Sequence, residues 1–131
     1  MSEAKDHRDP GDPAASGVES LEITIDAVDL EAAARFWEAA LGYRRLYERA
    51  PYVVLGPIGR NWPRVLVQQV PALRAEKSRV HLDLRVRDPG GEVRRLESLG
   101  ASLQEVVTEA GTTWTVMVDP GGTPFCVCPA R

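Results

Sequence analysis

Two stretches of alternating residues carry polar side chains that could hold a substrate or a metal ion. Glu22 lies on the polar face of the alternation at 21–27, and His81 and Asp83 lie on the polar face of the alternation at 80–86. Carboxylate and imidazole groups can transfer protons, and both can ligate a divalent cation. A fold that pairs these two stretches would therefore create a polar surface that could bind a metal ion or transfer protons to a substrate.

The two stretches belong to an internal repeat. Residues 21–42 and 80–100 each begin with a strand-like alternation, continue through an aspartate and a helical stretch, and end in Leu-Gly. Self-similarity of this kind predicts two copies of one supersecondary unit. Two such units packed about a pseudo-twofold axis would leave a cleft at their interface.

Four polar or ligating side chains fall at equivalent positions of the repeat. Glu22 superposes on His81, which lies 59 positions later. Gln68 aligns with Cys126, which lies 58 positions later. Each pair comes from the first or the last strand expected in the two units. A mouth lined by four strands could bring the four side chains together.

Four further residues could shape a binding site. Asp83 and Arg85 share a strand face with His81 and could orient its imidazole or bind a ligand. Trp62, in a loop, and Trp114, in a strand-like run, could stack on a flat ligand, since pockets for small molecules are often lined by aromatic rings.

Plainer explanations exist for several of these residues. Glu22 could face water, or it could pair with Arg85 or Arg64. Cys126 could be a small buried hydrophobic side chain, which is the usual environment of a reduced cysteine. Trp62 could simply close one end of the core.

Hydrophobic periodicity predicts the elements that must position these side chains. Aspartates open two helical stretches, at 29–42 and 88–100, that end near glycines. The order is strand, helix and three strands, twice, which makes an α+β protein of two βαβββ modules. Paired about the pseudo-twofold axis, the modules would form an open, barrel-like mixed sheet around a cleft. The expected strands are 21–27, 43–48, 52–55, 64–70, 80–86, 101–108, 113–118 and 125–128.

Length and charge bound the class of protein. The 131 residues suit one domain at 20–131, with modules at about 20–72 and 79–129. Residues 1–19 form an acidic stretch that we expect to be disordered, and the net charge is −3. The balanced charge beyond it gives no reason to expect a nucleic-acid or membrane partner. Without a signal peptide or a long apolar run, the expected location is the cytoplasm.

Three segments resemble the vicinal oxygen chelate superfamily, which includes glyoxalase I, bleomycin-resistance proteins and extradiol dioxygenases. They are DLEAAARFWEAALG, RVHLDLRV and DPGGTPFCV. The resemblance covers about residues 20–129 and is strongest to small glyoxalase-like domains with a KxRVHLDL strand, here Lys77–Leu84. It implies paired βαβββ modules, a homodimer, and a divalent metal held by one residue from each of four strands.

Carried over by position, the metal ligands would be Glu22, Gln68, His81 and Cys126, with Glu22 and His81 as the catalytic residues. Carboxylate, amide, imidazole and thiolate donors together suit no single metal well, so Ni, Zn, Mn or Fe and the absence of any metal remain alternatives. A two-histidine iron site is disfavoured, because the second of the two histidines, His7, lies in the acidic stretch.

Three functions follow from these expectations. The first is a glyoxalase-like enzyme of the lyase or isomerase class, whose substrate oxygens are chelated by a metal. The second is a metal-free protein that binds and sequesters a small molecule or an antibiotic. The third is an interaction module whose cleft has no ligand. The missing ligand types favour the second function, and the retained carboxylate, imidazole and amide favour the first.

Overall fold

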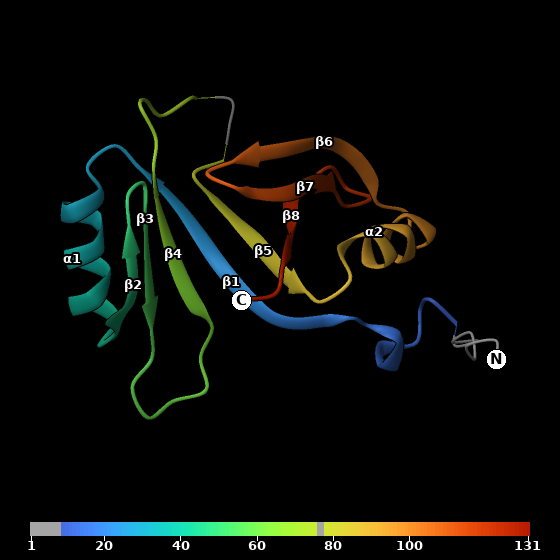
Figure 1. The fold of residues 1–131 in the computed structure, drawn as a ribbon, viewed down its shortest axis with the longest axis horizontal. Helices are drawn as coiled ribbons and strands as arrows, with labels where there is room; N and C mark the ends of the chain where they lie inside the picture. The colour runs from blue at the N-terminus through green and yellow to red at the C-terminus, as the bar shows by residue number, and fades with distance from the viewer. Residues whose placement is uncertain (1–8, 76–77) are drawn as a thin grey trace.

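The structure is a computed structural model that describes residues 9–75 and 78–131. The described part contains two α-helices, one short 3-10 helix and eight strands (Figure 1). The first module comprises β1 (Val18–Ala27), α1 (Leu30–Leu41), β2 (Arg44–Arg49), β3 (Tyr52–Gly56) and β4 (Arg64–Gln69). The second comprises β5 (Val80–Val86), α2 (Pro89–Ser98), β6 (Ser102–Glu109), β7 (Thr112–Val118) and β8 (Pro124–Pro129).

All eight strands belong to a single mixed sheet. Their order is β2-β3-β4-β1-β5-β8-β7-β6, so each module supplies four adjacent strands and the sheet stays open. β1 runs parallel to β4, β5 runs parallel to β8, and the antiparallel pair β1 and β5 joins the modules. The helices lie at opposite ends of the molecule in Figure 1. The predicted α+β fold with two βαβββ modules is therefore confirmed.

Both helices begin at the aspartates that the sequence indicates. Asp29 accepts a hydrogen bond from the Ala32 amide at 3.0 Å, and Asp88 accepts one from the Gly91 amide at 3.2 Å. α1 ends at Leu41 and is capped by Gly42, whose φ of 68° is a left-handed conformation that glycine adopts without steric cost. These local signals fix where each helix starts and stops against the sheet.

Alternation along β1 separates an apolar face from a polar face. Ile23 and Ile25 pack toward α1, whereas the polar side chains of Glu22, Thr24 and Asp26 are buried on the opposite face. The sheet therefore has a helix-covered apolar side and a concave polar side.

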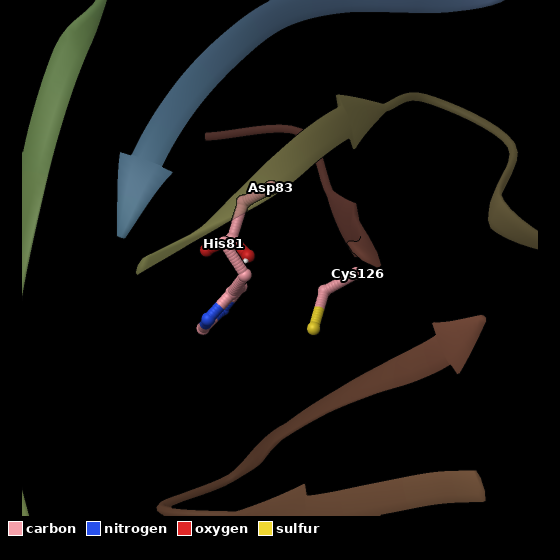
Figure 2. Close-up of side chains that lie close together, drawn as sticks. All are labelled: His81, Asp83 and Cys126. Carbon is pink, nitrogen blue, oxygen red and sulfur yellow. Dashed lines mark ion pairs between the residues drawn. The ribbon is translucent and has the colours of Figure 1, made fainter. Parts of the chain in front are cut away.

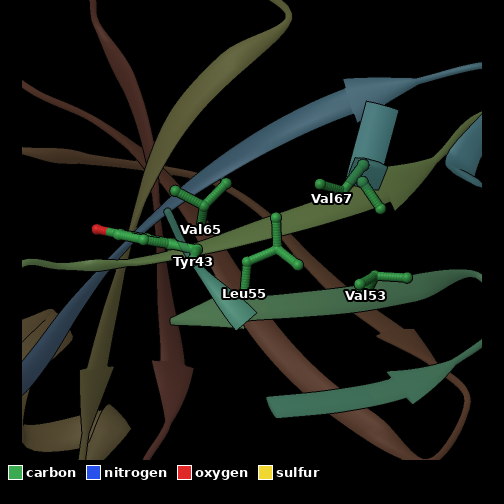
Figure 3. Packing of buried hydrophobic residues seen from close by; sticks show 6 residues of the cluster. Tyr43, Val53, Leu55, Val65 and Val67 are labelled. Carbon is green, nitrogen blue, oxygen red and sulfur yellow. The ribbon is translucent and has the colours of Figure 1, made fainter. Parts of the chain in front are cut away.

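Two apolar clusters stabilise the helix-covered side, one in each module. The first contains the buried residues Tyr43, Val53, Leu55, Val65 and Val67 (Figure 3). The second, under α2, is built on Val86, Val93, Met117 and Val127. Each module thus has its own core on the helix-covered side, and the concave side carries polar residues together with apolar ones such as Val54 and Leu66.

Residues 1–8 of the stretch expected to be disordered lie outside the described residues. Residues 76 and 77, the second of which is Lys77, also lie outside them. Within 9–19, a short 3-10 helix spans Pro13–Ala15 and β1 already begins at Val18, which pairs with Val86. The Gly17 amide donates to Glu92 Oε2 at 2.7 Å, which ties this stretch to α2. Neither helix of the described part is long and apolar enough to cross a membrane.

Candidate functional site

A cavity of about 190 Å³ opens on the concave side, between the two modules. The first module contributes side chains of β2, β3 and β4 to its lining, among them Gln68. The second contributes β5, β7 and β8, including His81 and Trp114. A pocket at a module interface, with apolar walls and a few convergent polar groups, is the usual form of a small-molecule site.

The polar face of β5 supplies the centre of this cavity. His81 and Asp83 project from alternate positions of β5, and the Nε2 of His81 lies 3.1 Å from Oδ1 of Asp83. The other oxygen of Asp83 accepts a hydrogen bond of 2.7 Å from the hydroxyl of Thr24 on β1. The opposite module therefore holds the carboxylate that lies beside the imidazole, while Oδ1 of Asp83 accepts no hydrogen bond from the described residues.

Cys126 joins this pair from the neighbouring strand. β5 and β8 pair in parallel with Asp83 beside Cys126. One ligand atom from each of His81, Asp83 and Cys126 lies within 4.8 Å of the other two, and Figure 2 shows the three side chains gathered on the same side of β5 and β8. Nitrogen, oxygen and sulfur donors of three residues, next to an open cavity, resemble the protein ligands of a catalytic zinc site.

Glu22 is held by arginines and is not grouped with these three residues. Its side chain is completely buried, and its oxygens lie 2.5 Å and 3.0 Å from Nε and Nη2 of Arg131. Arg85 Nε lies 3.4 Å from Oε1 of the same carboxylate. Because guanidinium groups surround both oxygens of Glu22, the four-strand ligand set implied by the resemblance does not fit the geometry.

The sequence analysis includes a pairing of Glu22 with Arg85 among its alternatives, whereas it contains no signal for Arg131. The Glu22–Arg131 contact joins residues 109 positions apart, and no local pattern signals it. The side chains of Arg85 and Arg131 both line the cavity, and Glu22 lies behind them.

The remaining candidates divide between the cavity and the surface. Gln68 and Trp114 line the cavity. Trp62 lies outside the lining, is half exposed, and has Arg60 stacked 4.4 Å from its ring centroid. Two aromatic residues that the sequence reading missed, Tyr47 and Tyr52, also line the cavity. The two strand-like runs at 43–48 and 52–55 are the sequence signal that could have found them, because the hairpin of β2 and β3 carries both rings to the concave side.

Cys128 also lines the cavity, and its burial disfavours the ionised form of its thiol. Burial raises the pKa of Cys128 to about 12, and the negative charge of Asp83 adds to this effect. The thiol therefore stays protonated at neutral pH, and a protonated thiol is a poor nucleophile and a poor metal ligand.

We expect Cys128 to resist alkylation in the folded protein. At about pH 8, a thiol with this pKa is ionised in roughly one molecule in ten thousand, so iodoacetamide should not modify it on the timescale of an ordinary thiol. Peptide mass spectrometry after labelling tests this, with the urea-unfolded chain as the positive control. Equal labelling of Cys128 in the folded and unfolded chains would contradict the assignment.

Comparison with solved structures places this geometry among known proteins of the same shape. Methylmalonyl-CoA epimerase from Mycobacterium tuberculosis superposes with a TM-score of 0.66 at 20% identity, covering 93% of this chain and 95% of that one. A glyoxalase/bleomycin resistance protein/dioxygenase superfamily member from Vibrio splendidus gives 0.56 at 20% identity, covering 83% and 97%. A structure described as an NAD-dependent benzaldehyde dehydrogenase from Legionella pneumophila gives 0.67 at 10% identity, covering 85% and 99%.

At these identities the structural matches establish the fold alone. No curated protein sequence matches the chain. The sequence from residue 22 to residue 128, however, matches the family described as the glyoxalase-like domain, and this range includes both modules. The chain therefore belongs to the glyoxalase-like domain family.

Proposed function

We propose that this protein is a small-molecule enzyme of the lyase or isomerase class, and that its substrate binds in the cavity between the modules. The observation that carries the proposal is the convergence of His81, Asp83 and Cys126 at the cavity wall. These three residues, rather than the set containing Glu22, are the ones that would hold a divalent metal. Such an ion would supply Lewis-acid stabilisation for negative charge on a substrate oxygen.

The other cavity residues would position the substrate. Gln68 faces the cavity from β4, and its amide can donate or accept a hydrogen bond. Burial raises the pKa of Tyr52, and the charge of Glu109 adds to the effect, so its hydroxyl remains a hydrogen-bond donor at neutral pH. Trp114 offers a flat apolar wall that would exclude water from the bound substrate.

Metal content is the measurement that tests this proposal. Purified, untagged protein is loaded with nickel, zinc, manganese or iron, dialysed, and assayed by elemental mass spectrometry. We expect one metal ion per chain, with affinity reduced by at least about tenfold in His81→Ala and in Cys126→Ser. Cys128→Ser is the matched thiol control, because Cys128 lies two positions away on the same strand and outside the three-residue group. It should leave metal binding unchanged.

The second candidate function is metal-free binding of a small molecule. It is favoured by the burial of Glu22 against two arginines and by the aromatic side chains Tyr47, Tyr52 and Trp114 in the cavity. Protein that takes up no metal under any loading would contradict the metal-assisted enzyme and support sequestration. The homodimer and the cytoplasmic location remain predictions.

A further inference from the structure

We propose that the cavity selects small carboxylate anions, and that Arg85 and Arg131 are the residues that recognise them. This inference names the ligand class of the site under Proposed function and rests on that proposal for the location of the ligand. It does not depend on a metal ion.

The charges around the cavity are unbalanced. Among the described residues that line it, three arginines (Arg49, Arg85 and Arg131) face one carboxylate, that of Asp83. Counted over side chains alone and with Glu22, which lies behind the lining, included, one positive charge is in excess. A cavity with this charge distribution attracts anions and disfavours cations, because the low dielectric of its walls strengthens the field inside it.

Arg85 carries hydrogen-bonding capacity that the described residues do not use. Arg85 is 9% exposed, and its Nε has no hydrogen-bond partner within the described part of the chain. Its Nη1 makes only a long bond of 3.3 Å to the carbonyl of Pro129, and its separations from Glu22 and Asp83 are 3.4 Å and 4.0 Å. The Nε itself is buried beside Glu22, so an oxyanion in the cavity would reach the Nη atoms of this guanidinium, whose contacts with the described residues are long.

Arg131 is held in an orientation that suits the same ligand. The edge formed by its Nε and Nη2 contacts Glu22, and its side chain is 31% exposed where it lines the cavity. With that edge taken, the hydrogens on Nη1 are directed away from Glu22. A guanidinium fixed by a buried carboxylate loses little entropy on binding, and its planar fork matches a carboxylate better than an ammonium group does.

Glu22 has a specific role in this arrangement. Its completely buried carboxylate anchors Arg131 at hydrogen-bond distance and attracts Arg85, but it also offsets part of their positive charge. Neutralising Glu22 should therefore strengthen anion binding, whereas neutralising either arginine should weaken it. Changes in affinity of opposite sign, produced by variants of one cluster, distinguish ligand recognition from general damage to the fold.

The test is isothermal titration calorimetry with matched pairs of probes. Acetate, phenylacetate and succinate are compared with their neutral amides, using the full chain both as purified and after treatment with EDTA. We expect each carboxylate that binds to do so at least about tenfold more tightly than its amide, with and without EDTA, because the selectivity comes from the two guanidinium groups.

The variants report on each residue of the cluster. Arg131→Gln and Arg85→Gln should weaken carboxylate binding by about tenfold, and Glu22→Gln should strengthen it by up to about tenfold. Arg87→Gln is the matched control, since Arg87 lies two positions beyond Arg85 with a side chain that is 85% exposed. It should bind the probes as the parent does. A gain in Glu22→Gln cannot result from misfolding, and circular dichroism checks the fold of the two arginine variants.

The outcomes separate this inference from the proposed enzyme. Carboxylates that bind no more tightly than their amides would overturn it. Selectivity that disappears with EDTA would also overturn it, because a bound metal ion rather than the arginines would then be holding the carboxylate. A chain that takes up no metal but keeps carboxylate selectivity supports the inference and contradicts the metal-assisted enzyme alone.

Discussion

Replacing Arg85 by methionine is expected to lower the free energy of unfolding by about 3 kcal/mol. Methionine retains much of the volume of the side chain, so the expected loss comes mainly from charge. Glu22 is completely buried and Asp83 is 4% exposed, and Arg85 lies beside both carboxylates. Removing this buried cation leaves Glu22 with Arg131 as its remaining cationic partner and leaves Asp83 without its nearby guanidinium, so two buried negative charges lose part of their compensation. Urea denaturation followed by circular dichroism measures the change.

Two further variants make the Arg85 prediction specific. Arg87→Met should change the free energy of unfolding by less than about 1 kcal/mol, because Arg87 forms an exposed pair with Glu19. In the Glu22→Gln background, Arg85→Met should cost clearly less than it does in the parent. Equal costs in the two backgrounds would mean that Arg85 does not stabilise the protein through Glu22.

Truncating Leu55 to alanine should lower the free energy of unfolding by about 3 kcal/mol. Leu55 is completely buried in the core cluster of the first module, between neighbours such as Val53 and Val65 (Figure 3). Removing three carbon atoms there loses burial energy and leaves a cavity that close-packed neighbours fill only in part.

Leu46→Ala is the control for this second prediction. Leu46 lies on the edge strand β2 and is 39% exposed, so its truncation should cost about 1 kcal/mol or less. The comparison uses the same chemical change on neighbouring strands. Similar losses in the two variants would contradict the placement of the core on the helix-covered side of the sheet.

The sequence by itself determined the elements of the fold and much of their arrangement. Alternation placed Glu22, Thr24 and Asp26 opposite Ile23 and Ile25, because successive side chains of a strand point to opposite faces. Capping aspartates marked where the helices begin, because their side chains satisfy free amides of the first turn. The internal repeat then predicted two paired modules. These are local or periodic signals, and they can be interpreted without knowledge of tertiary contacts because each is a property of a short stretch.

The boundaries depended on contacts that local patterns do not contain. β1 starts three residues earlier than the alternation indicates, because Val18 pairs with Val86 on β5. α2 ends at Ser98, two residues before Gly100, which still adopts a φ of 104°. Such ends are decided by pairing partners and by the turn that follows.

Only the tertiary structure decided how the site residues are grouped. The parallel register of β5 and β8 sets Cys126 beside Asp83, and the central antiparallel pair lets Thr24 hold Asp83. The same packing buries Glu22 against Arg131, which lies 109 positions further along the chain. The sequence identified which side chains share a face, because that depends on the period of a strand. It could not identify their partners, because ion pairs and ligand clusters depend on strand order and register across the sheet.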